Sequence, residues 1–494
     1  IAPLIDQLAN DIDDQRKLPA ELLTALHENG LFRMLLPKSF GGEEVTPLEF
    51  MDAIETLARH DASVAWCIGQ ANGCAMTAAY LAPEISEEIW GRDPLGAVAW
   101  GPGQAEAKVV EGGYRLSASL MFASGGRHAT WLGCHTAVKD VDGVVIKGPD
   151  GNPELRTFLM PSSEIDMVDV WDVIGLRGTA SDGYNLKEVF VPEQYVTARD
   201  KPYARVYDAP LYIYPSMTMF AQGFACVALG IAQGALGDFL AFAQGKTPRL
   251  AKSTVSDSAV AQTETAHASA RIMAARALLR QEAEAIWGEV CSTGELTVAA
   301  RARIRLASTY AIHEAKSAVD VLFDLAGADA IFKSKPFERR FRDIHTVTQQ
   351  LQGRKTHLQS VGAWMMGKDP SLELEQDTIM DADILWQHDL RALDFKILEK
   401  KRRRQERSRW KAIKTSLVFA ILMMLGLIGL KVSDHQLEGL NLSQQRMKDQ
   451  VPLVLESQRL LEKLKQNQLG GIDPFGTIGR VAIYRGGGFD NPHV

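Results

Sequence analysis

The sequence predicts an α+β protein in which helices and strands occupy separate stretches of the chain. Before about residue 95, apolar side chains recur at helical spacing, between 96 and 208 they alternate with a period of two, and after Pro210 glycine and proline become sparse. We therefore expect an N-terminal helical domain over residues 1–95, a central β-barrel-like domain over 96–208, a C-terminal four-helix bundle over 209–370 and a tail over 371–494. A doubly wound parallel sheet is not expected, because strands and helices do not alternate.

Capping residues mark the helices of the first part. Leu22, Leu23 and Leu26 share one helical face, and Asn29-Gly30 supplies a left-handed stop. Thr46-Pro47-Leu48-Glu49 is a capping box with proline at the first helical position. The apolar run 62–81 is rich in glycine, asparagine and glutamine, so we expect a buried helix rather than a membrane span.

The central part contains short β-type runs separated by clusters of Gly, Asp, Asn and Pro. The expected strands are 114–120, 143–146, 157–160 and 187–191. The long helices that follow are expected to break at 245–248, Gly294, Gly327 and Pro336.

The tail differs in composition from the rest of the chain. Residues 400–414 include nine basic side chains, and residues 415–430 carry no charge. We expect 415–430 to be a transmembrane helix, although sixteen residues are short for a bilayer, and a buried helix or a gene fusion are the alternatives. The basic flank would place the body of the protein on the cytoplasmic side, anchored to the inner face of a membrane.

Composition excludes several classes of function. Lys and Arg number 54 against 61 Asp and Glu, a net charge of −7 that argues against a dedicated nucleic-acid binder. The five cysteines form no C-x-x-C pair, which excludes a disulfide framework and a cysteine zinc site and favours a reducing cytosol. No paired histidine spacing indicates a metal. The chain begins at Ile1 without a signal pattern, so we expect a truncated or processed start.

Two small-residue segments could approach a planar or anionic ligand. They are Phe122 to His128, which contains Ser124-Gly125-Gly126, and Gly175 to Ser181. Each alone is compatible with an ordinary turn, and neither is a dinucleotide fingerprint or a phosphate loop.

Taken in order, the motifs of residues 1 to about 368 resemble the acyl-CoA dehydrogenase superfamily. The segments that carry the resemblance are Leu18-Pro19, Leu36-Pro37 with Phe40-Gly41-Gly42, Ser63 to Trp66, Ser124-Gly125, Gly175 to Ser181, Val191-Pro192-Glu193, Gly327-Ala328 and Arg342-Asp343. Leu229 to Ala232 and Phe337 to His345 are more similar to its flavin-dependent monooxygenase branch. The tail resembles nothing in the family.

The resemblance implies an acyl-CoA dehydrogenase-like fold, a homotetramer and a flavin, FAD or FMN, between sheet and bundle. It implies that the flavin is approached by two groups of residues. From the β domain these are Ala123, Ser124, Gly125, Gly178, Thr179 and Ser181, and from the bundle, across a subunit boundary, Gly327, Arg342 and Asp343.

The acid or base of the reaction is not evident. Acyl-CoA dehydrogenases commonly carry a glutamate base eight or nine residues after the Arg of the Arg-Asp motif, and here those positions are Gln350 and Leu351. An amide does not accept a proton at useful pH. Gln350 therefore occupies the vacant acid/base position, with His345 and His128 as candidate replacements.

Three functions remain open at this point. The preferred one is a two-component monooxygenase that uses reduced flavin from a separate reductase, and O2, on a small organic substrate. The others are an FAD-dependent acyl-CoA dehydrogenase and a non-catalytic, membrane-tethered flavin-binding protein.

Overall fold

The computed structural model describes residues 1–148 and 151–369 of the chain. Within these residues the N-terminal helices, the β sheet and the C-terminal helices follow one another along the chain, as the sequence predicts for an α+β fold. The predicted transmembrane segment 415–430 lies outside the described residues.

The N-terminal part contains helices α1 (Ala2–Gln15), α2 (Ala20–Glu28), α3 (Pro47–His60), α4 (Ala62–Ala75) and α5 (Pro83–Ser86). The predicted capping box begins α3: the Thr46 side chain accepts from Glu49 N, and Glu49 accepts from Thr46 N at 2.8 Å. Asp61 ends α3 and caps α4 through Ser63 N. Every residue of α4 is buried, which confirms the buried helix.

The central part forms one eight-stranded sheet: β1 (Val98–Trp100), β2 (Gly103–Val110), β3 (Gly113–Ala123), β4 (Trp131–Lys139), β5 (Leu155–Pro161), β6 (Met167–Val168), β7 (Asp182–Pro192) and β8 (Val196–Thr197). The strand order is β6-β7-β3-β2-β4-β5-β8, and β1 also pairs with β4. The β1–β4 and β2–β4 pairs are parallel and the others antiparallel. This sheet curls into a half-barrel.

Three of the four predicted strands are confirmed, and one is wrong. Residues 143–146 make only an isolated bridge, Lys139 to Val145, in the loop after β4. Val144 and Val145 are exposed there and only Ile146 packs against the core of the sheet, so the run has no continuous apolar face to bury. The alternating strands β2 and β4 were not among the predicted runs.

The C-terminal helices are α6 (Ser216–Gly245), α7 (Ala259–Thr293), α8 (Val298–Ala326), α9 (Pro336–Val347) and α10 (Thr356–Met365). The predicted breakers Gly245, Gly294, Gly327 and Pro336 stand at their ends. Three helices are long, and the shorter α9 packs on α6 and α8, which completes a group of four packed helices. The helical domain is thus confirmed.

Among the described helices, α6 is long and apolar enough to cross a membrane. It packs against α3, α4, α8 and α9, and its central residues are buried. We therefore interpret α6 as a core helix of the bundle.

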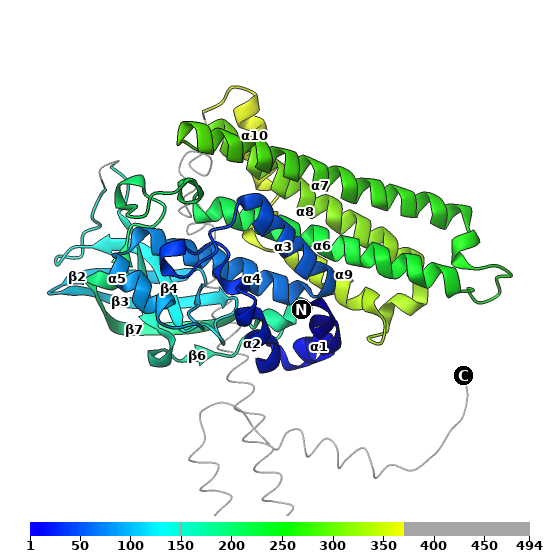
Figure 1. Cartoon of the computed structure of the whole chain (residues 1–494), viewed down its shortest axis with the longest axis horizontal. Helices are drawn as coiled ribbons and strands as arrows, with labels where there is room; N and C mark the ends of the chain where they lie inside the picture. Colours follow the sequence, from blue (N-terminus) through cyan, green and yellow to red (C-terminus); the bar gives the residue numbers. More distant parts are fainter. Residues whose placement is uncertain (149–150, 370–494) are drawn as a thin grey trace, which may run out of the picture. The chain divides into compact units, whose positions relative to one another are not determined.

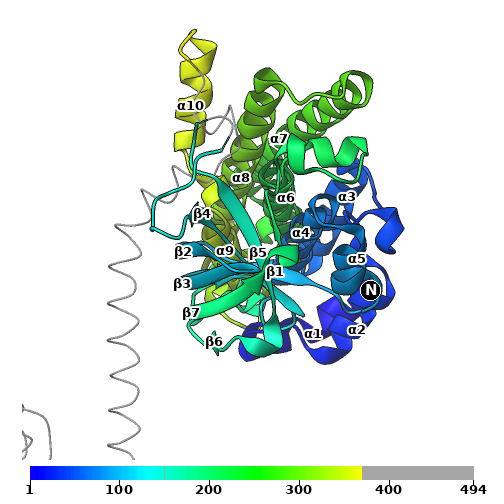
Figure 2. The same ribbon diagram turned by 90° about the vertical axis from the view of Figure 1, so that its left-hand side faces the viewer.

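The N-terminal helices connect the other two parts. α3 and α4 pack on α6, and α4 also packs on β1. Figure 1 shows the sheet at one end and the long helices at the other, and Figure 2 shows α1, α2 and α5 along one flank of the sheet.

Candidate functional site

A cavity of about 300 Å³ lies where the sheet, α4, α6 and the segment after α9 meet. Its lining residues come from stretches that are far apart in sequence, including Trp66 in α4, Ser124 after β3, Phe220 in α6 and Gln350 after α9. Such a cavity between layers is a usual position for a ligand site.

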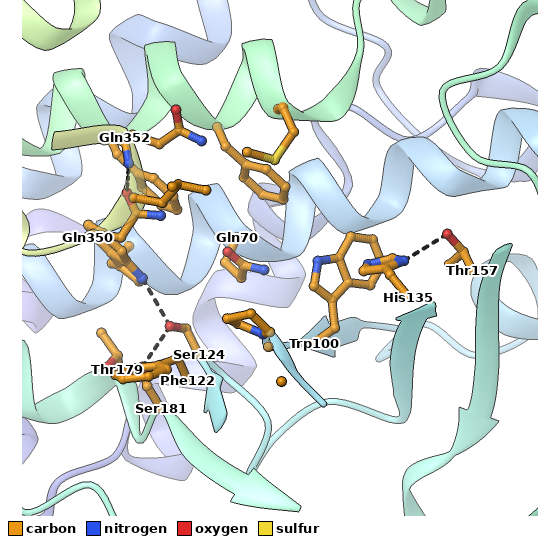
Figure 3. Close-up of a pocket in the computed structure, with 18 of the residues that line it drawn as sticks. Gln70, Trp100, Phe122, Ser124, His135, Thr157, Thr179, Ser181, Gln350 and Gln352 are labelled. Atoms are coloured by element: carbon orange, nitrogen blue, oxygen red, sulfur yellow. Dashed lines mark hydrogen bonds between the residues drawn. The ribbon is translucent and has the colours of Figure 1, made fainter. Parts of the chain in front are cut away.

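One end of the cavity contains a chain of hydroxyl groups (Figure 3). Trp66 Nε1 donates to Ser124 Oγ at 3.0 Å, Ser124 and Ser181 lie 2.6 Å apart, and Ser181 and Thr179 lie 2.7 Å apart. Thr179 Oγ1 donates to the Leu176 carbonyl at 2.8 Å. Because a carbonyl only accepts, every hydroxyl proton in the chain points toward Leu176, and the remaining lone pairs can accept from a ligand.

The turns that carry these hydroxyls contain unusual backbone conformations. Phe122, Leu176 and Ala180 have φ values of 62°, 50° and 45°, a region that residues other than glycine seldom occupy. Phe122 and Leu176 line the cavity, and Ala180 lies between Thr179 and Ser181. Strain of this kind is concentrated at functional sites.

The turn at 175–181 is fixed against α9. Asp343 Oδ1 accepts from Leu176 N at 2.6 Å, and Arg342 pairs with Asp13 and Glu338. Burial, followed by the charge of Asp61, raises the pKa of Asp343 to about 7. Arg342 and Asp343 thus lie behind the cavity wall rather than in it.

The small residues of the predicted flavin site have structural roles in the turns and at the helix end of this region. Ala123 is fully buried at the end of β3, and Gly125 has a φ of 77°. A Cβ at Gly178 would lie 2.2 Å from Ile12, so this glycine allows the turn to pack on α1. Gly327 ends α8, away from the cavity.

The position at which acyl-CoA dehydrogenases carry their glutamate base lies in the cavity wall, and here it is Gln350. Its Oε1 accepts from Gln352 N at 2.6 Å and so caps the turn after α9. Figure 3 places Gln350 on the same side as Ser124.

The two candidate histidines are not brought into the cavity. His345 Nε2 lies 2.8 Å from Asp320 Oδ1, between α9 and α8. His128 packs edge-on against Phe32, and burial, with the charge of His27, lowers its pKa to about 4.

Residues that sequence reasoning missed form the other end of the cavity, where Figure 3 shows Trp100, His135 and Thr157. His135 Nδ1 lies 2.8 Å from Thr157 Oγ1, and its ring meets the Trp100 ring edge-on at 4.6 Å. The Arg199 guanidinium lies 5.0 Å from the centroid of Trp100. The alternation of 131–139 could have identified His135, whereas nothing in the sequence around Arg199 marks it.

Within the described residues there is no group of His, Cys, Asp or Glu side chains that could hold a metal ion. The neutral hydroxyls and aromatic rings of the hydroxyl end instead fit an organic ring system.

Known proteins resemble the chain over the same residues. Acyl-CoA dehydrogenase N-terminal and C-terminal domain families match residues 2–88 and 222–352. Indole-3-acetate monooxygenase from Pseudomonas putida is 30% identical over 366 residues, 73% of this chain and 90% of the relative. The flavin-dependent monooxygenase oxygenase subunit HsaA from Mycobacterium tuberculosis is 32% identical over 70% of this chain and 88% of the relative.

The chain belongs to the acyl-CoA dehydrogenase superfamily, in its flavin-dependent monooxygenase branch. The crystal structure of 3-HSA hydroxylase from a Rhodococcus species agrees, with a TM-score of 0.69 at 27% identity over 76% of this chain and 96% of that one.

The family membership resolves the main functional question. The protein is a flavin-dependent monooxygenase of the oxygenase-component type, and reduced flavin is its cosubstrate. This confirms the preferred function and makes the protein an enzyme, so the non-catalytic alternative is not retained.

Proposed function

We propose that this oxygenase component takes reduced flavin from a separate reductase and hydroxylates a small aromatic compound. The relatives support both parts, since HsaA is named as an oxygenase subunit and a Rhizobium relative is named FADH(2)-dependent resorcinol hydroxylase, oxygenase component. When bound, reduced flavin supplies two electrons, with which one oxygen atom of O2 enters the substrate and the other leaves as water.

The hydroxyl chain is the observation that carries the proposal. Its protons are used within the chain, so Ser124, Ser181 and Thr179 offer acceptors to the cavity. A flavin ring gains an N–H donor on reduction, and an acceptor-rich site favours that form. We assign these three residues to binding and orienting reduced flavin, with Arg342 and Asp343 positioning the turn that carries two of them.

The acyl-CoA dehydrogenase alternative needs a carboxylate base. Among the described residues that line the cavity, Asp200 alone has a carboxylate, and it accepts from Ser216 N and pairs with Arg199. Both of its oxygens are thus engaged by Ser216 and Arg199, which assigns Asp200 to holding this segment rather than to the role of the base.

We also propose a homotetramer in the cytoplasm. Ile331 and Phe332, adjacent residues just after α8, are each more than half exposed and offer an apolar surface that a second copy could cover. Cys67, Cys74, Cys134 and Cys226 are buried and form no disulfide, which fits a reducing compartment.

The test supplies chemically reduced FMN or FAD, ¹⁸O2 and a panel of aromatic compounds that begins with indole-3-acetate. We expect a product that carries one ¹⁸O atom and forms only with reduced flavin. Stopped-flow absorbance without substrate should show that bound reduced flavin reoxidises in two resolved phases. Reoxidation indistinguishable from that of free flavin, or bleaching of oxidised flavin by an acyl-CoA, would refute the proposal.

A further inference from the structure

The charged residues of the cavity are gathered at one end. Among its described lining residues, those with full charges are Arg156, Asp200, Arg199 and Lys201, three cations and one carboxylate. Arg199 lies over Trp100, and Arg156, which pairs with Glu154, precedes Thr157, the partner of His135. The hydroxyl end, by contrast, is lined by neutral side chains. Because Glu154 pairs with Arg156 and Asp200 pairs with Arg199, the Trp100 end differs from the hydroxyl end by its cationic hydrogen-bond donors rather than by a large net charge.

Arg199 is the most enclosed of these cations. Its side chain is 7% exposed, and Nη1 pairs with Asp200 at 3.1 Å and donates to Ser216. Its Nε is buried and has no hydrogen-bond partner among the described residues. A buried guanidinium donor without a partner is unfavourable, and a bound acceptor would remove that penalty.

His135 adds a second unpartnered nitrogen in the same place. Its Nδ1 is engaged by Thr157, whereas its buried Nε2 has no partner among the described residues. Burial and the charge of Arg199 hold the pKa of His135 well below its usual value. The ring is therefore neutral, and it can contribute an N–H without adding a charge that Arg199 would repel.

We infer that the Trp100 end binds the carboxylate of an aromatic acid, with Arg199 as the principal partner and His135 beside it. This inference rests on the proposed function and specifies its substrate class. A guanidinium matches a carboxylate in geometry and charge, and the low polarity of a cavity strengthens that pairing. The rings of Trp100 and Phe220, which also line the cavity, fit the aromatic part of such a substrate.

The first experiment needs no variant. The full-length protein, loaded anaerobically with reduced flavin, is titrated with indole-3-acetate and with its neutral amide, indole-3-acetamide, and the two dissociation constants are compared. We expect the acid to bind at least about tenfold more tightly. Equal affinities, or tighter binding of the amide, would overturn the inference.

Variants then test which side chain causes the tighter binding of the acid. Arg199→Gln should abolish it, and Arg199→Lys should retain part of it, because the charge remains without the planar fork. Arg205→Gln is the matched control, since Arg205 follows six residues later, pairs with Asp208 and does not line the cavity. If Arg199→Gln does not fold, Lys201→Gln takes its place and should weaken the acid more than the amide. An equal loss for acid and amide would show a structural role only.

A last comparison separates the substrate carboxylate from the flavin phosphate. Reduced FMN and reduced riboflavin differ by that phosphate, so Arg199→Gln should lower the affinity of the protein for both to the same small extent. A selective loss of affinity for FMN, with the preference for the acid intact, would show that these cations bind the flavin phosphate and would overturn the inference. Two-phase reoxidation with no preference for the acid would refute this inference and leave the proposed function standing.

Discussion

The hydroxyl chain is the most direct residue-scale test of the flavin site. The double variant Ser124→Val and Thr179→Val removes acceptors and leaves Trp66 Nε1 without its partner. With each hydrogen bond worth about 0.5–1.5 kcal/mol, we expect reduced flavin to bind about tenfold more weakly. Fluorescence or calorimetric titration under anaerobic conditions measures this.

Ser117→Ala is the control for that variant. Ser117 is on the same strand β3, bonds Glu188 and does not line the cavity. Its affinity for reduced flavin should equal that of the unchanged protein. A folded double variant with unaltered affinity would contradict the assignment.

Substitutions of Gln350 test whether the vacant acid/base position lies at the reacting centre. Gln350→Glu keeps an acceptor for Gln352 N and places a carboxylate in the cavity wall. We expect a change in turnover of about 10²-fold, or a new pH dependence, for Gln350→Glu and Gln350→His. Gln349→Glu, one residue away in the same wall, is the control. Superimposable pH–rate profiles for all variants would place Gln350 outside the reacting centre.

We expect His128 to make the stability of the protein sensitive to acid. Its folded pKa, about 4, lies below the unfolded value of about 6.5, so its contribution is complete above pH 6.5 and is lost as pH falls toward 4. That amounts to about 2 kcal/mol between pH 7 and pH 5.

The variant His128→Phe keeps an aromatic ring against Phe32 and removes the titration. Its free energy of unfolding, from denaturant titrations at pH 7 and pH 5, should fall less on acidification than that of the unchanged protein. The exposed His267→Gln on α7 should behave like the unchanged protein. Equal losses for His128→Phe and the unchanged protein would show that His128 is not the sensitive group.

At the scale of elements, the contact between the 175–181 turn and α9 positions the hydroxyl chain. A Cβ at Gly175 would lie 2.2 Å from the Arg342 carbonyl oxygen, so Gly175→Ala must push the turn away from α9. We expect a loss of about 1–3 kcal/mol in the free energy of unfolding, together with weaker flavin binding.

Gly288→Ala is the matched control for Gly175→Ala. Gly288 is exposed within α7 and a Cβ there meets nothing within 4 Å, so the change should stabilise the helix by about 0.5–1 kcal/mol. Urea titrations compare both variants with the unchanged protein. If Gly175→Ala proves as stable as Gly288→Ala, the contact with α9 does not hold the turn.

Local signals account for the elements that the sequence predicted well. These signals are residues at helix ends that act through their own backbone or through a cap: Thr46, Gly245, Gly294 and Pro336. Their effect can therefore be predicted from the local sequence alone. The prediction of a strand at 143–146 was wrong because a strand needs a continuous ladder and a buried face, and both are set by the whole sheet.

The candidate site could be predicted only in part for the same reason. Ser124, Thr179 and Ser181 belong to motifs that resemble a family, and all three line the cavity. His135 and Arg199 are brought together by strand register and by the segment after β8, which no local pattern reveals. His345 and His128 resemble acid–base candidates in sequence but bond or pack elsewhere.

At the scale of the whole molecule, the proposed tetramer predicts the mass of the assembly. Four copies of a 54.3 kDa chain weigh about 217 kDa, which light scattering after size exclusion can measure. The sequence also predicts that segment 415–430 holds the chain in the membrane pellet after a carbonate wash, in which case the mass is measured in detergent. A monomeric mass would contradict the tetramer, and extraction by carbonate would contradict the span.

The cavity draws on residues from Trp66 to Gln352, so its walls span most of the described chain. During synthesis from the N-terminus, the last wall residues leave the ribosome only after the sheet and three long helices have already been made. We therefore expect reduced flavin to bind only after most of the sheet and the long helices have been made. Because a ligand that binds only the folded chain stabilises it, we expect chains made when flavin is scarce to open more easily at this centre and to be degraded faster.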